Sequence, residues 1–189
     1  MENVEIKNAD IQNVENKSVD TKKVKKRVKR NLLQLLIKIG IFIAFVFVMF
    51  TFILGLKRFT GNNMFPMFKD GDLCFYFRLT DFYLDDVVVY KNPNGELQLG
   101  RIVGLENQEI NFPKEGGYTL NDSIPSEYLP YETYKSEYSE IEYPLNIPEG
   151  SYFILNDFRS DTKDSREYGV ISKKDIKGKV IYLLRRRSF

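Results

Sequence analysis

The longest uninterrupted hydrophobic pattern lies near the N-terminus. Residues 39–56 form a run of eighteen without a charged side chain, IGIFIAFVFVMFTFILGL, and apolar residues from Leu32 onward extend it. An α-helix rises ~1.5 Å per residue, so this run alone would cover about 27 Å, close to the thickness of a bilayer's hydrocarbon core. Lys38 can extend its ammonium group to the lipid headgroups. The pattern predicts a transmembrane helix over residues 32–56.

Two other structures can give an apolar run near an N-terminus. A cleaved signal peptide has a shorter apolar region, of ~7–15 residues, which ends at small residues. Here the run leads directly into Leu56-Lys57-Arg58-Phe59, which contains no small residue. A buried helix of a soluble core is also disfavoured, because the run has five phenylalanines and no polar face. The membrane-spanning interpretation is therefore preferred.

Beyond the apolar run, the pattern changes to short stretches of aromatic and β-branched residues. Turn signals at Asp70-Gly71-Asp72 and Asn92-Pro93-Asn94-Gly95 separate them, and the only helical signal is a possible turn at Ser172–Ile176. We expect strands at Leu73–Arg78, Val87–Tyr90, Leu97–Leu105, Tyr152–Leu155 and Val180–Leu184. The predicted fold class is mainly β: one N-terminal transmembrane helix followed by a curved, antiparallel, barrel-like β-domain.

A stretch of different composition interrupts the predicted β-domain. Residues 127–143 hold five Glu and five Tyr with few aliphatic side chains. We interpret residues 106–147 as an insertion that covers the domain like a cap. It is either a solvated loop or a partner-binding surface, since tyrosines give large contact areas with few rotatable bonds. The predicted organisation is a tail at 1–31, the helix at 32–56 and a β-domain at 57–189.

Charge is distributed unevenly on the two sides of the apolar run. The 189-residue chain has a net charge of +2, but residues 1–30 hold nine basic and five acidic residues, whereas residues 57–189 hold eighteen and twenty-one. Seven of the positive charges fall within residues 22–30. Basic flanks stay in the cytoplasm, so we predict a single-pass cell-membrane protein with residues 57–189 outside. The tail should be disordered, and its basic run should contact anionic lipid rather than nucleic acid.

The composition also restricts the chemistry. The chain has no histidine and a single cysteine, Cys74. Within this chain there can be no Ser-His-Asp triad, no Cys-His pair, no internal disulfide and no cysteine metal cluster. We therefore expect no metal and no cofactor. Cys74 itself lies in an apolar strand and is interpreted as a small buried hydrophobe.

Four sequence blocks follow the apolar run in a fixed order. They are Gly61-Asn62-Asn63-Met64-Phe65-Pro66-Met67, Lys69-Asp70-Gly71-Asp72, Leu99–Leu105 and Pro148–Arg166. In order and spacing they resemble the bacterial type I signal peptidases, the membrane-anchored Ser-Lys proteases of peptidase family S26. That family reads roughly G-x-S-M-x-P-T, then G-D, then K-R-x-x-G, then G-D-N-R-x-x-S-x-D-S-R. The most specific part is Asp164-Ser165-Arg166 with Asp157 and Arg159 upstream.

The chain departs from the family at both catalytic positions. The family's nucleophilic serine aligns with Asn63, and its general-base lysine aligns with Gly100. A carboxamide has no hydroxyl to activate and glycine has no base, so neither half of the dyad is intact. The family's Gly-Asp-Asn-Arg also reads Asn156-Asp157-Phe158-Arg159 here. We expect the missing lysine to leave a gap behind Asn63 unless neighbouring side chains fill it.

The resemblance also implies roles for residues around the lost dyad. A peptide-binding cleft would be formed by Gly61, Met64, Phe65, Pro66 and Arg101. A structural network behind the cleft would be formed by Asp157, Arg159, Asp164, Ser165 and Arg166.

Two hypotheses about function follow. In the first, the chain is a non-catalytic signal-peptidase-like protein that binds exported proteins, pilins or signal-peptide segments. Signal-peptidase-like proteins without the Ser-Lys pair act in Gram-positive pilus assembly beside a sortase, so a sortase or an active signal peptidase is a further expected partner. In the second, the chain is an active signal peptidase with a displaced nucleophile and base. A scaffold role that uses the Tyr/Glu insertion remains a third option.

Overall fold

The computed structural model describes residues 26–126 and 131–185. It begins with a helix over Lys26–Ile53, whose last turn, η1 (Met49–Ile53), is a π-helix. The predicted tail at 1–31 therefore needs correction, because residues 26–31 are helical, while residues 1–25 lie outside the described part. The predicted helix end at residue 56 is also corrected, since Leu54–Leu56 already belong to the strand β1 (Leu54–Arg58).

The helix Lys26–Ile53 is long and apolar enough to cross a membrane, and its apolar window has no part buried against the protein. The chain divides into two compact units, Met1–Met49 and Phe50–Phe189. The first unit contains one helix in its described residues. That helix could serve as a membrane anchor.

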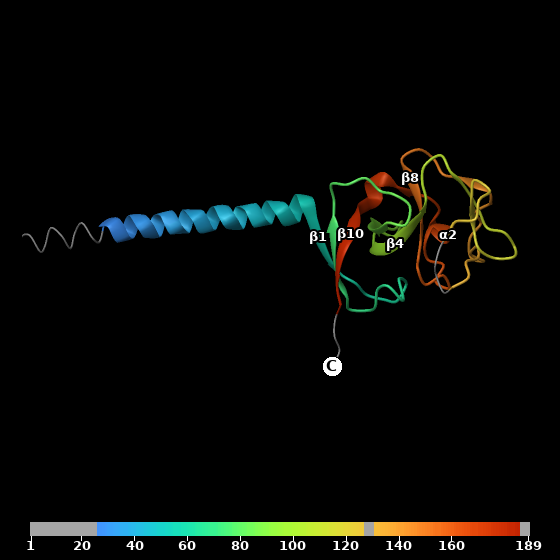
Figure 1. The fold of residues 1–189 in the computed structure, drawn as a ribbon, viewed down its shortest axis with the longest axis horizontal. Helices are drawn as coiled ribbons and strands as arrows, with labels where there is room; N and C mark the ends of the chain where they lie inside the picture. Colours follow the sequence, from blue (N-terminus) through green and yellow to red (C-terminus); the bar gives the residue numbers. More distant parts are fainter. Residues whose placement is uncertain (1–25, 127–130, 186–189) are drawn as a thin grey trace, which may run out of the picture. The chain divides into compact units, whose positions relative to one another are not determined.

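The second unit is built on a curled antiparallel sheet of seven strands in the order β1-β2-β10-β3-β4-β8-β9 (Figure 1). Apart from β1, these strands are β2 (Leu73–Phe77), β3 (Val87–Lys91), β4 (Leu97–Gly104), β8 (Ser151–Leu155), β9 (Ile171–Ser172) and β10 (Ile176–Leu184). The predicted mainly β, barrel-like domain is confirmed. The short helices α2 (Ser165–Tyr168) and η2 (Lys173–Asp175) interrupt it, and only η2 falls on a predicted turn.

Glycine lets the first strand approach its neighbour. In β1, Gly55 pairs with Tyr76 of β2, and a Cβ atom on Gly55 would lie 2.0 Å from the Tyr76 ring. Any other residue would clash there. Gly55, which has a low helix propensity, thus lies at the point where the helix ends and the first strand begins.

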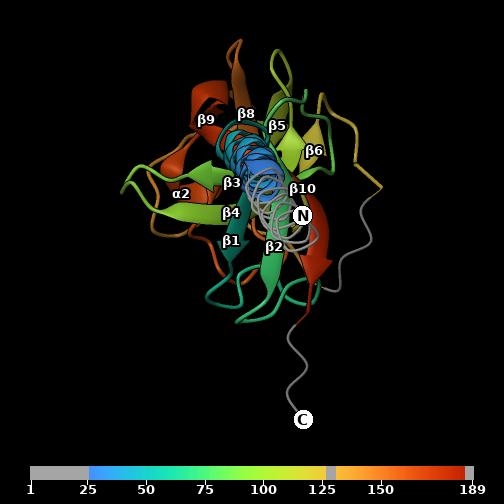
Figure 2. The ribbon, with the colours of Figure 1, turned by 90° about the vertical axis from the view of Figure 1, so that its left-hand side faces the viewer.

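The insertion forms a small sheet of its own. Its three strands have the order β6-β5-β7 and comprise β5 (Glu109–Asn111), β6 (Thr119–Leu120) and β7 (Leu145–Asn146) (Figure 2). Ile110 is fully buried in a cluster with Phe153 and Leu155 of β8. The segment is therefore packed against the main sheet by apolar contacts rather than being a wholly solvated loop.

Both faces of the central strands are buried. In β3, Val87 and Val89 point into one core cluster, whereas Val88 and Tyr90 point into another on the opposite face. This is the alternation of a pleated strand with a core on each side. Each such side chain contributes ~1.5–3 kcal/mol by burial. The first core cluster borders the candidate site, and the second lies behind it.

Candidate functional site

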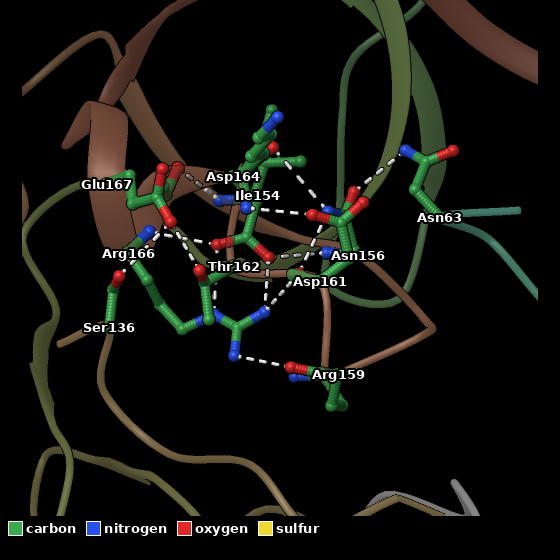
Figure 3. A network of polar contacts seen from close by, with 12 residues as sticks. Asn63, Ser136, Ile154, Asn156, Arg159, Asp161, Thr162, Asp164, Arg166 and Glu167 are labelled. Carbon is green, nitrogen blue, oxygen red and sulfur yellow. Dashed lines mark hydrogen bonds and ion pairs between the residues drawn. The ribbon is translucent and has the colours of Figure 1, made fainter. Parts of the chain in front are cut away.

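Asn63 is held in place by three hydrogen bonds. Its Nδ2 donates to Asn156 Oδ1 at 2.9 Å and to the Leu99 carbonyl of β4 at 3.2 Å. Its own carbonyl accepts the N–H of Phe158 at 2.9 Å. Figure 3 shows the Asn63 side chain pointing toward Asn156. The carboxamide therefore joins three segments that are far apart in sequence, and it presents no group that could act as a nucleophile.

Gly100 lies in the middle of β4, and its surroundings are already full. A Cβ atom built on it would lie 2.4 Å from Ile154 Cγ2 and 3.1 Å from Tyr90 Cε1. Both neighbours are fully buried. The expected gap behind Asn63 is therefore absent, because the Ile154 and Tyr90 side chains occupy the space that a longer side chain would need. The Tyr90 hydroxyl donates to Gln98 Oε1 at 3.1 Å, which fixes its ring.

A groove opens beside Asn63. It has a volume of about 190 Å³. Its walls are Lys57, Phe59, Thr60, Gly61, Asn62, Asn63, Leu97, Gln98, Asp161 and Lys163. The chain after β1 forms one wall and the start of β4 forms another. The surface beside Asn63 is thus concave, with mostly polar walls.

One edge of this groove is an unpaired strand edge. Residues Leu97–Gly100 of β4 pair with β3, but pairing with β8 begins only at Arg101. On that open side, the Leu99 carbonyl accepts the Asn63 carboxamide. Unpaired backbone groups at a strand edge can accept a further strand. Among the described residues, the start of β4 therefore has no partner strand on this side.

The five predicted cleft residues separate into different environments. Gly61 lines the groove, and its N–H donates to Asp70 Oδ1 at 2.9 Å. Met64 is fully buried in the first core cluster, while Phe65 and Pro66 are exposed outside the groove lining. The fifth residue, Arg101, lies outside the groove lining too.

Arg101 belongs to the structural network. It forms a bidentate pair with Asp157, with Nε–Oδ1 and Nη2–Oδ2 distances of 2.8 and 2.7 Å. Its Nη1 also donates to the Asp85 carbonyl at 2.8 Å. Such fork-to-fork pairs fix orientation as well as supplying charge-assisted hydrogen bonds. Arg101 therefore ties β4 to the loop that follows β8.

Asp164 and Arg166 form the centre of the network. Arg166 donates Nε and Nη2 to the two Asp164 oxygens at 3.0 and 2.7 Å, and both side chains are buried. Asp164 also accepts the N–H groups of Asn156 and Arg166, which caps α2. Burial raises the pKa of the Asp164 carboxyl, while the guanidinium and these N–H groups lower it. The Arg166 guanidinium therefore offsets part of the free-energy cost of burying the Asp164 carboxylate.

The other two predicted network residues are also buried. Ser165 Oγ accepts the N–H of Ile154 at 2.9 Å, which links α2 to β8. The Arg159 guanidinium lies 5.8 Å from the centre of the Tyr118 ring, and its carbonyl accepts Arg166 Nη1 at 2.7 Å (Figure 3). Hydrogen bonds thus join Arg159, Asp164 and Arg166 next to Ser165, whereas Asp157 pairs with Arg101.

The insertion packs against the loop that follows β8. The Tyr131 ring packs edge-on against Phe158 with centroids 5.1 Å apart, and the Tyr134 carbonyl accepts Arg166 Nη1 at 3.2 Å. Ser136 Oγ donates to Glu167 Oε1 at 3.1 Å, an oxygen that also accepts Thr162 Oγ1 (Figure 3). Thr162 is therefore directed toward Glu167.

Other groups could in principle replace the lost dyad. Thr60 supplies a hydroxyl to the groove walls, and Lys57 and Lys163 supply amines. No hydrogen bond joins Thr60 Oγ1 to either amine within residues 26–126 and 131–185. Cys74 is fully buried, and burial raises the pKa of its thiol to about 11. The described groove contains no assembled nucleophile and base.

The described residues include no cluster of three acidic or cysteine side chains suited to a metal ion. The absence of a cofactor stays a prediction.

Comparison with known proteins gives the family. The model of the family described as "Signal peptidase, peptidase S26" matches residues 32–184. The chain belongs to this family.

Individual relatives are distant. Signal peptidase IB of Staphylococcus aureus (strain Mu50) is 25% identical over 175 residues, covering 82% of this chain and 90% of that protein. Signal peptidase I V of Bacillus subtilis (strain 168) is 26% identical over 131 residues, covering 62% and 78%. A crystal structure of a signal peptidase I from Enterococcus faecalis V583 matches with a TM-score of 0.44 and 24% identity, over 55% of this chain and 98% of that one.

Within the signal peptidase fold, sequence reasoning misses several residues that shape the site. Asn156 stands out in the sequence only as a departure from the family pattern, yet it is the side-chain partner of Asn63. Tyr90 and Ile154 are assigned to strands, with no sign that they meet at Gly100. Both lie on strands that neighbour β4, Tyr90 on β3 and Ile154 on β8, so cross-strand register is needed to find either of them.

Proposed function

We propose that this signal peptidase family member is a non-catalytic pseudoenzyme that binds extended segments of exported proteins or pilins and assists their assembly at the cell surface. One observation supports it most: Asn63 replaces the nucleophile, and the space of the general base is filled by Ile154 and Tyr90. Because Ile154 and Tyr90 occupy the space beside Gly100, a lysine side chain at this position would require the core to repack.

The chemical argument rests on how a Ser-Lys pair works. An amide-bond hydrolase of this type needs an activated hydroxyl and a desolvated amine within hydrogen-bond reach of each other. Asn63 donates both of its described side-chain hydrogen bonds through Nδ2, to Leu99 and Asn156. Removing either member of a catalytic unit abolishes most of its rate, and here both are replaced.

Peptide binding needs only the features that remain. The open edge at Leu97–Gly100 can accept a strand through backbone hydrogen bonds, and the groove beside it can receive alternate side chains. Because these groups do no chemistry, binding and release would be the whole function of the site.

Membrane attachment follows from the apolar helix and from one face of the sheet. Leu56, Phe75 and Tyr182 lie in one cross-strand row on β1, β2 and β10, and Leu56 and Tyr182 are exposed. We propose that this face contacts lipid, that the N-terminus is cytoplasmic and that the β-domain lies outside.

The decisive experiment measures cleavage by the full-length protein in detergent and binding by the same full-length protein in membranes. A fluorogenic signal-peptide substrate should remain uncleaved, while a photo-crosslinking amino acid at Gln98 in membranes should capture an exported protein or pilin. Turnover that is lost in Thr60→Ala or Lys57→Gln would refute the proposal and establish the displaced-dyad alternative. Capture of a sortase or signal peptidase at the same position would instead identify an assembly partner.

A further inference from the structure

We propose that the groove at Asn63 selects segments that place a carboxylate beside the open edge of β4, and that Lys57 and Lys163 determine this selectivity. The inference rests on the proposed peptide-binding function and names its ligand class: an extended peptide with acidic side chains at alternate positions. It differs from a pocket for small apolar side chains, which is what the family resemblance alone would suggest.

The position of Lys57 is set by strand alternation. Gly55 of β1 and Phe59, the residue after the end of β1, are both buried, so Lys57 between them lies on the same inner face. It pairs with Cys74 of β2, another inward-facing residue. Lys57 is half-buried and lines the groove. The Lys57 side chain is thus partly buried at the groove, where solvent and salt screen a charge less than on an exposed surface.

Lys163 reaches the groove from the loop that follows β8. Its backbone is anchored, because its N–H donates to Asp161 Oδ1 at 3.1 Å and its carbonyl accepts Asn156 Nδ2 at 3.5 Å. The same Asn156 accepts the Asn63 carboxamide. The backbone of Lys163 is therefore part of the scaffold that holds the site, and its exposed side chain lines the groove.

The acidic groups near the groove leave a positive excess. Asp161 is the acidic residue in the groove lining, and its Oδ1 already accepts a backbone N–H. Asp70, just outside the lining, accepts the N–H of Gly61. Within the described residues, no ion pair joins Lys57 or Lys163 to any carboxylate. The groove is thus lined by two lysines and by one aspartate that already accepts a hydrogen bond.

A strand added at Leu97–Gly100 would place every second side chain on the same side. A carboxylate on that side can accept hydrogen bonds from both ammonium groups, and such charge-assisted bonds are among the strongest available to a peptide. A methyl group would desolvate the ammonium groups and offer no acceptor, and a lysine would be repelled. The only apolar walls are Phe59 and Leu97.

The test uses three fluorescent decapeptides in which Thr alternates with Asp, Ala or Lys. Alternation makes the result independent of the exact register along β4. We expect fluorescence polarisation with full-length protein in detergent to show the Asp peptide binding about tenfold more tightly than the Ala peptide, and the Lys peptide most weakly. The difference should shrink as salt is raised from about 50 to about 500 mM.

Two variants connect the preference to the groove. In Lys57→Gln/Lys163→Gln the ratio of Asp to Ala affinity should fall to near one. The matched control Lys114→Gln, an exposed lysine of the insertion, should retain the wild-type ratio. Equal affinity of the Asp and Ala peptides for the wild type would overturn this inference while leaving peptide binding intact. Failure of all three peptides to bind would overturn it too, and cleavage of a signal-peptide substrate would separately refute the proposed function.

Discussion

Gly100 shows how a single residue can be fixed by its neighbours. Ile154 Cγ2 would lie 2.4 Å from any Cβ atom added there, and the Tyr90 ring covers the same space. Burying a large side chain against them would need strain or repacking, which commonly costs ~1–3 kcal/mol. The replacement of the general base is thus coupled to the packing of β3, β4 and β8, and reversing it requires more than one substitution.

Simple reversion of the dyad is therefore expected to fail. Asn63→Ser/Gly100→Lys should remain inactive toward a fluorogenic signal-peptide substrate, and its thermal midpoint should drop, because the new lysine competes with Ile154 and Tyr90 for space. Adding Ile154→Ala should recover part of the lost stability and permit the first measurable cleavage. Robust cleavage by the double variant alone would contradict this packing argument.

A second residue-scale prediction concerns the buried ion pair. Arg166→Gln should lower the free energy of unfolding at pH 7 by ~3–5 kcal/mol, because it leaves the Asp164 carboxylate buried without its guanidinium. Urea unfolding followed by tyrosine fluorescence would measure this, with Lys174→Gln on the surface as the control.

The pH dependence of that variant has a definite sign. Burial already raises the pKa of Asp164, and loss of Arg166 removes an influence that lowers it. A carboxyl whose folded-state pKa exceeds its unfolded value gives stability that is lost as pH rises. The deficit of Arg166→Gln should thus be largest at pH 7 and smaller at pH 5. A deficit that grows on acidification would show that Asp164 is not the group left uncompensated.

At the scale of elements, β1 is the part that the sequence placed least well. It begins at Leu54, directly after the helix, and its first three residues pair with Phe77, Tyr76 and Phe75 of β2. A chain that starts at Lys57, where the β-domain was predicted to begin, would lack these pairs. It would also uncover the Tyr76 ring, which packs over Gly55.

This gives a direct comparison of two truncated chains. Residues 57–189 should unfold about 5–10 °C below residues 54–189 in differential scanning fluorimetry, because an edge strand is cut and apolar surface is exposed. The longer chain serves as the matched control. Equal midpoints would mean that β1 adds nothing to the stability of the sheet.

At the scale of the whole molecule, the apolar helix and the charge distribution imply a topology that a single labelling experiment can test. Tyr138 is 87% exposed on the insertion, whereas the sole cysteine is buried with a pKa of about 11. In Tyr138→Cys, a membrane-impermeant maleimide added to intact cells should label the new thiol, and the wild type should stay unlabelled. Labelling that appears only after permeabilisation would place the β-domain in the cytoplasm.

Much of this fold was accessible from local patterns. The apolar run, the β-rich remainder and the family blocks were readable because each depends on residues close together in sequence. A structural role for Asp157, Asp164 and Arg166 was expected from the family resemblance, and the structure pairs Asp157 with Arg101 and Asp164 with Arg166. The helix–strand boundary at Leu54 and the short helix α2 were missed, since tertiary pairing decided the first and the Asp164 cap decided the second.

The sequence alone determined that Asn and Gly stand at positions 63 and 100, because residue identity is a covalent fact; that these are the family's dyad positions stays a prediction from the resemblance. It also indicated a helix long and apolar enough to cross a membrane, through hydrophobic length, and the class of the domain, through alternation. Only the tertiary structure decided what replaced the pair. The Asn63–Asn156 bond, the filling of the lysine space by Tyr90 and Ile154, and the inward position of Lys57 all depend on contacts between distant segments. Such contacts follow from register and packing, which no local pattern specifies.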